Sequence, residues 1–134
     1  MGPGMRHLAV VLAASWIAAC APPDPAPAIT TDTYLTRLPD GFATLDACTA
    51  AVPDPQECVA EMVLCTTGDF HVQVGDVVDS GTYYVDRDIA VGERDGIEDF
   101  RLVLATGVMT SGNGLAGDHP WTAPTTDFGV VSCN

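Results

Sequence analysis

Lysine is absent from this sequence, and five arginines face 18 acidic residues in a chain of 134. The formal charge is −13 with histidines neutral. Such a surface repels phosphate backbones and anionic lipid headgroups, so we predict no nucleic-acid partner. The same charge attracts cationic proteins over long distances. A cationic protein partner is therefore one interpretation of the charge, and solubility alone is the simpler one.

An apolar run long enough to span a membrane is also missing near the N-terminus. The run there, Leu8 to Ala19, has twelve residues, whereas a membrane-spanning helix needs about 20. It follows a short polar head that carries Arg6, which is typical of a signal peptide. We predict that residues 1–19 are cleaved. The remaining 115 residues hold four arginines and 18 acidic residues, a formal charge of −14.

The end of this apolar run carries a short motif: Ile17, two alanines and Cys20. The motif resembles the lipobox of bacterial lipoproteins. In that family the cysteine thiol receives a diacylglycerol, a peptidase cuts directly before the cysteine, and the new amine is commonly acylated. The resemblance implies lipidation of Cys20, and two or three fatty chains anchor a protein stably to a membrane. The rival interpretation is an ordinary secretory signal followed by an ordinary cysteine.

The residues after the lipobox imply a tether and a location in the cell. Residues 20–33 include several prolines, which favour an extended spacer, so we place the folded domain at residues 34–134. In the sorting rule of such lipoproteins, an aspartate after the cysteine retains the protein at the inner membrane. This chain has Ala21 there. The resemblance therefore implies the cell envelope, at the outer membrane and facing the periplasm.

An odd number of cysteines in an exported chain leaves one without a partner, and lipidation of Cys20 accounts for it. Four cysteines remain for two disulfides in an oxidising compartment: Cys48, Cys58, Cys65 and Cys133. Three pairings are available. We favour Cys48 with Cys58, which pins a local loop, and Cys65 with Cys133, which ties the early part of the domain to its end. A zinc site is disfavoured because the chain has no Cys-x-x-Cys pair.

Periodicity predicts a mainly β fold with a short N-terminal helical segment. Residues 42–52 have helical spacing, and Asp54 with Pro55 favours a second helix, although "MVLC" fits a strand equally well. From Phe70 onward the period is two, with a tight turn at residues 87–88 and short strands through "DFRLVLA", 108–110 and "FGVVSC". We predict a small antiparallel meander or barrel stapled by two disulfides, with an α+β fold as the alternative.

Catalytic motifs are scarce. No Gly-x-Ser-x-Gly elbow surrounds a serine, and neither His71 nor His119 has an evident partner for acid–base chemistry. The six carboxylates between Asp86 and Asp99 lack the spacing of a calcium-binding EF-hand loop. We predict no catalytic residue, cofactor or metal. The leading hypothesis is a non-enzymatic, lipid-anchored envelope protein with a binding or structural role, and a weak envelope hydrolase is an alternative.

One further stretch, "TSGNGLAGDHPWTA" at 110–123, carries a Ser-Gly-x-Gly turn and a Trp-Thr pair after an earlier Cys-x-x-Gly. It resembles the membrane-bound inhibitors of C-type lysozyme, small periplasmic lipoproteins with an eight-stranded antiparallel barrel. The resemblance implies that Ser111 and Gly112 enter the lysozyme cleft, and that the acidic surface steers the domain toward a cationic enzyme. Trp121 is more simply a core residue.

Overall fold

A computed structural model describes residues 28–111, 114–124 and 131–134. The predictions for the leader and for Cys20 lie outside the described residues, as does Gly112. Within the described part of the chain, no helix is long and apolar enough to cross a membrane.

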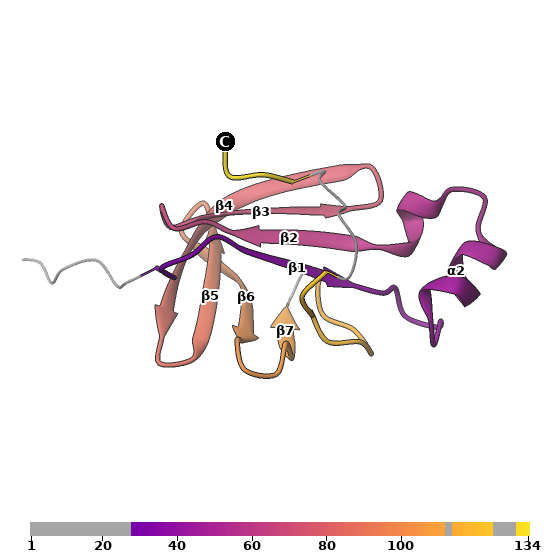
Figure 1. The fold of residues 1–134 in the computed structure, drawn as a ribbon. Helices are drawn as coiled ribbons and strands as arrows, with labels where there is room; N and C mark the ends of the chain where they lie inside the picture. The colour runs from indigo at the N-terminus through magenta and orange to yellow at the C-terminus, as the bar shows by residue number, and fades with distance from the viewer. Residues whose placement is uncertain (1–27, 112–113, 125–130) are drawn as a thin grey trace, which may run out of the picture.

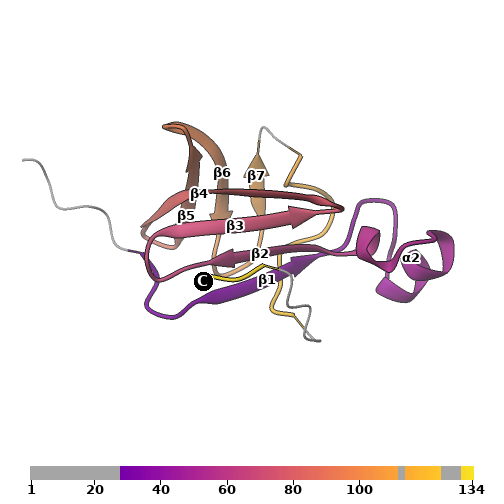
Figure 2. The ribbon, with the colours of Figure 1, turned by 90° about the horizontal axis from the view of Figure 1, so that it is seen from above.

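Seven antiparallel strands form one sheet in which each strand pairs with its neighbours in the sequence. Figures 1 and 2 show that the sheet curls into a half-barrel. The predicted mainly β meander is therefore confirmed. The strands are β1 (Thr33–Arg37), β2 (Ala60–Leu64), β3 (Asp69–Val74), β4 (Val77–Asp86), β5 (Ile89–Arg94), β6 (Ile97–Val103) and β7 (Met109–Ser111).

Two-residue turns set the register of the hairpins. The predicted turn at residues 87–88 joins β4 to β5, and Arg87 has a φ of 62° there. Asp95 and Gly96 join β5 to β6 with φ values of 53° and 77°. Positive φ at both central residues suits the right-handed twist of the flanking strands, which is why Asp-Gly is a frequent hairpin turn.

The core fills the concave side of the sheet. Phe70 of β3 and Phe100 of β6 meet edge to face with ring centroids 5.0 Å apart. A Cβ on Gly92 would overlap the ring of Phe100, so only glycine leaves room at that point of β5. The predicted alternation holds at Phe70 and Val72, which are buried, but Val74 is 44% exposed where β3 leaves the core.

The helical segment is shorter than predicted. Helix α2 covers Leu45–Ala51, and the Thr44 side chain caps it by accepting a hydrogen bond from the Ala47 N–H at 3.1 Å. The second predicted helix is reduced to η1, a single 3₁₀ turn over Pro55–Cys58 with Asp54 as its N-cap. The strand alternative for "MVLC" is confirmed at Met62 to Leu64, which lie in β2. All five residues of β2 are buried, and a fully buried strand reads as a continuous apolar run that resembles a helix segment.

Both predicted disulfides are confirmed: Cys48 pairs with Cys58, and Cys65 pairs with Cys133. The second bond holds the end of the chain on the convex side of β2, where Val131 packs against Val63. The described residues 131–134 form no strand, so the predicted last strand is wrong there, and residues 128–130 lie outside the description.

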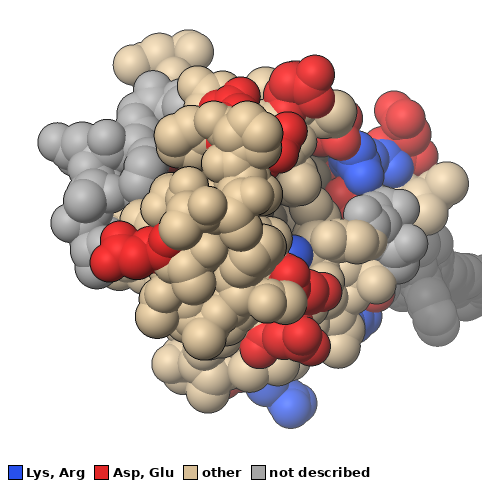
Figure 3. Space-filling model, turned by 90° about the vertical axis from the view of Figure 1, so that its right-hand side faces the viewer, with Lys and Arg blue, Asp and Glu red and all other residues tan. Residues whose placement is uncertain are grey.

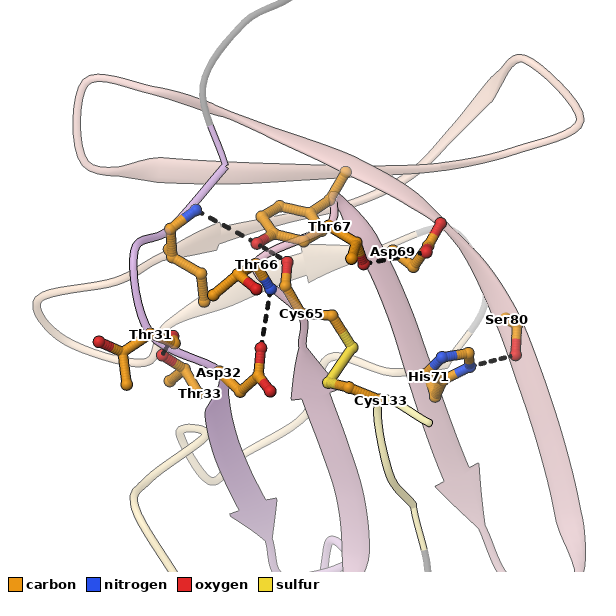
Figure 4. The surroundings of a disulfide bond; sticks show 12 residues. Thr31, Asp32, Thr33, Cys65, Thr66, Thr67, Asp69, His71, Ser80 and Cys133 are labelled. Atoms are coloured by element: carbon orange, nitrogen blue, oxygen red, sulfur yellow. Dashed lines mark hydrogen bonds between the residues drawn. A yellow bond between two sulfur atoms is a disulfide. The ribbon is translucent and has the colours of Figure 1, made fainter.

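Hydrogen bonds from distant segments surround the buried Cys65 (Figure 4). The Tyr83 hydroxyl donates to the Cys65 carbonyl at 2.5 Å and accepts from the Ile29 N–H at 3.2 Å. The Asp32 carboxylate accepts from the Thr66 N–H at 2.8 Å. These bonds tie the start of the domain to β2 and β4.

A loop over residues 115–123 crosses the open side of the half-barrel. Thr122 exchanges two backbone hydrogen bonds with Thr36 of β1, at 2.7 and 2.9 Å. The backbone N–H of Trp121 donates to the carbonyl of Gly107, which lies between β6 and β7, at 2.9 Å. The Trp121 ring is only 2% exposed, so Trp121 belongs to the core, as the sequence indicated.

Candidate functional site

A cleft of about 280 Å³ lies where β1 ends, beside α2 and the loop that crosses the half-barrel. Figure 3 views this end of the molecule, where a small basic area is recessed among uncharged and acidic groups. The walls combine apolar side chains with a few polar ones. The lining residues are Thr36, Arg37, Leu38, Leu45, Val59, His119, Pro120, Thr122 and Ala123.

Arg37 supplies the permanent positive charge of the cleft. Its side chain is 7% exposed, and the guanidinium lies over the Trp121 ring, 5.9 Å from the ring centroid. Nη1 donates to the Leu38 carbonyl at 3.1 Å and to the Asp40 carboxylate at 3.0 Å. The buried Nε has no hydrogen-bond partner among the described residues. The guanidinium therefore keeps at least one unused donor.

Asp40 holds Arg37 from the solvent side. The Asp118 N–H donates to the Asp40 carboxylate at 2.8 Å, and this bond, followed by the hydrogen bond and charge of Arg37, lowers the pKa of Asp40. A Cβ on Gly117 would overlap both Asp40 and Arg37. The glycine thus lets the crossing loop close over the ion pair.

His119 lines the same cleft from the crossing loop. Its Nε2 lies at hydrogen-bonding distance from the Phe42 carbonyl, so the N–H of Nε2 donates to that oxygen. The partner lies 77 residues away in the sequence and is a backbone carbonyl, so it holds the ring in place and supplies no acid–base group. None of the described residues lining the cleft is acidic.

This cleft was not identified from the sequence. Arg37 and Leu45 carry no motif, and Val59 looks like any apolar residue of a predicted helix. The only signal near it was His119 before Pro120 in a turn-like stretch. The cleft arises where four segments meet: the end of β1, α2, the residue before β2 and the loop that crosses the half-barrel. No local sequence pattern therefore indicates it.

Ser111 lies at the end of β7, opposite Phe100 of β6, and is half-buried. Its neighbour Gly112 is outside the described residues, so insertion of these two residues into a lysozyme cleft stays a prediction. Ser111 does not line the cleft beside α2.

A serine and a histidine do lie together elsewhere in the structure. His71 of β3 and Ser80 of β4 are register partners, and Nδ1 lies 2.6 Å from the Ser80 Oγ (Figure 4). The prediction that His71 lacks a partner is therefore wrong. The pair is exposed on the sheet surface and does not line the cleft beside α2.

No group of three or more His, Cys, Asp or Glu side chains is arranged to hold a metal ion within the residues that the structure describes. No protein-family model, curated protein or solved structure matches the chain.

Proposed function

We propose that this chain is a lipid-anchored binding protein of the bacterial cell envelope, tethered at Cys20 and facing the periplasm from the outer membrane, without catalytic activity. The observation that carries the proposal is the arithmetic of the cysteines. Four of the five are joined to one another in two disulfides. Cys20 therefore has no cysteine of its own chain to pair with, which suits a thiol that is alkylated.

The two disulfides support an oxidising compartment. All four bonded cysteines lie in one small domain, and domains of this size gain much of their stability from such bonds when they are exported. The predicted tether is shorter than residues 20–33, because Ile29, Asp32 and Thr33 belong to the folded domain. The proline-rich sequence between Cys20 and Ala28 would separate this domain from the anchor. The cleft beside α2 supports a binding role, because an apolar pocket with a few polar groups is typical of a ligand site.

Metabolic labelling with an alkyne fatty acid tests the anchor. The wild-type chain should carry the label and partition with membranes, and Cys20→Ser should lose both properties. A double variant, Cys48→Ser with Cys58→Ser, removes two thiols but should keep the label. Label that persists in Cys20→Ser would refute lipidation at this residue.

A second candidate is inhibition of a cationic lysozyme. The formal charge of −13 supports attraction to such an enzyme, and Ser111 stands at the end of the last strand, where a loop begins. The test follows lysis of cell walls by lysozyme with and without the protein. Ser111→Arg should abolish inhibition, whereas Thr110→Arg, which adds the same charge on the opposite face of β7, should retain it. Unchanged lysis in the presence of the wild-type protein removes this candidate.

The hydrolase alternative is supported only by the contact between His71 and Ser80. Ester turnover by the purified chain that disappears in Ser80→Ala would favour it over the binding role. We expect no turnover by either protein.

A further inference from the structure

We propose that the cleft beside α2 binds a small carboxylate with an apolar group, and that Arg37 holds the carboxylate. The inference rests on the proposed binding function and names the ligand class for it. Three features support it: the unused donor of Arg37, the apolar walls and the absence of acidic residues among the described lining.

The guanidinium of Arg37 is prepared for an anion. Arginine presents five N–H donors, and the structure shows Nη1 occupied by Leu38 and Asp40 while the buried Nε has no partner among the described residues. A buried donor without a partner is costly. The Nε–H and the neighbouring Nη2–H form a fork that fits the two oxygens of a carboxylate. Asp40 contacts only Nη1, and the buried Nε has no partner among the described residues, so a carboxylate that reaches this edge of the guanidinium would meet an unpaired donor.

The walls select the rest of the ligand. The apolar lining comes from Leu38 and Pro120, from Leu45 of α2 and from Val59 before β2. An apolar group is transferred from water into such a pocket favourably. The volume of about 280 Å³ lies just below the range of about 300–1,000 Å³ that holds drug-sized ligands, so we expect a ligand near the size of one amino-acid residue.

The charge distribution explains why the anion would enter here. A chain with a formal charge of −13 repels anions over most of its surface. At the cleft, Arg37 and His119 are the ionisable lining residues described, and both are basic. Asp40 partly cancels the charge, but its side chain is 54% exposed and its field is weakened by solvent. The attraction is therefore local and depends on entry into the cleft.

Calorimetric titration of the full chain in non-ionic detergent with N-acetylleucine tests the inference. N-acetylleucinamide has the same shape without the charge, and we expect it to bind at least about tenfold more weakly. A hydrogen bond between charged groups contributes more free energy than a tenfold change in Kd requires. Arg37→Gln should reduce binding of the acid to the level of the amide. Arg101→Gln removes an exposed arginine on β6 and should bind as the wild type does.

A second variant covers the case in which Arg37→Gln does not fold. Leu45→Trp fills the cleft from α2 without touching the guanidinium, and it should abolish binding of both probes. Equal affinity for the acid and the amide, unchanged binding in Leu45→Trp, or no binding by the folded wild type up to about 10 mM would each overturn the inference. None of these results bears on lipidation, because the labelling of Cys20 is measured separately in cells.

Discussion

The two disulfides should differ in what they contribute to stability, because they close loops of different length. Cys65 and Cys133 are separated by 68 positions in the sequence, and Cys48 and Cys58 by 10. A cross-link lowers the entropy of the unfolded chain, and the effect grows with the length of the loop that it closes. Replacing both members of the longer pair by alanine should therefore destabilise the domain more than replacing both members of the shorter pair.

The chain-entropy relation gives the magnitudes. It assigns about 4.4 kcal/mol to the longer loop and about 2.7 kcal/mol to the shorter one. Cys48 and Cys58 are fully buried, whereas Cys65 is 1% exposed and Cys133 is partly buried. The longer pair therefore loses no more buried packing than the shorter pair, and a larger loss of stability in its variant reports the loop. For a domain of about 100 residues, 1 kcal/mol corresponds to about 4 °C in Tm. The two variants should lose about 18 °C and about 11 °C.

Urea titration of both double-alanine variants, followed by far-ultraviolet circular dichroism, measures the two losses directly. The wild type with reductant serves as a control, and it should lose about 7 kcal/mol, comparable to the whole stability of a typical domain. The reasoning is refuted if the Cys48 and Cys58 variant is equally or more destabilised. Such a result would mean that the Cys48–Cys58 disulfide stabilises the domain through contacts in the folded state rather than by restricting the unfolded chain.

Three further outcomes are expected. Tyr83→Phe should cost about 0.5–1.5 kcal/mol in urea unfolding, because it removes the hydroxyl that donates to the Cys65 carbonyl and accepts from the Ile29 N–H, while the Gly68 N–H still donates to that carbonyl. Burial raises the pKa of Tyr83, so the stability that this residue contributes is present below about pH 10 and is lost at higher pH. The wild type should lose stability above that pH, whereas Tyr83→Phe should not. Curves of stability against pH that run parallel for the two proteins would contradict this. Gly92→Ala should cost about 1–3 kcal/mol by overlap with Phe100, and Phe100→Leu should recover part of that loss in a double-mutant cycle. The pKa of Asp40 is lowered by a backbone N–H and then by an arginine, so its stabilisation is present above about pH 4 and is lost at lower pH. Asp40→Asn should flatten the acid limb of the stability curve, and an unchanged limb would exclude this contribution.

Local patterns predicted the strands well where one face is buried and the other is wet. Phe70 and Val72 alternate with polar residues, and the hairpin turn at residues 87–88 has its expected place. The alternation rule left helix and strand open at β2, because its residues are buried on one face by the core and on the other by the end of the chain. Hydrophobic periodicity does not distinguish a strand buried on both faces from a helix. The contact with Val131 that buries the second face of β2 comes from the end of the chain, so the sequence around β2 gives no sign of it.

The structure selected the favoured cysteine pairing among the three that the sequence left open. The sequence by itself determined the antiparallel fold class, the number of disulfides and the acidic charge. Each of these follows from composition, count or a period that repeats within a few residues. Only the tertiary structure decided the cleft, the burial of the Arg37 guanidinium and the partners of His71 and His119. Those contacts join residues from different strands and loops; His119 and Phe42, for example, are 77 positions apart. Sequence patterns report on residues that are close along the chain, whereas a binding site depends on which distant segments the folded backbone brings within a few ångströms of one another.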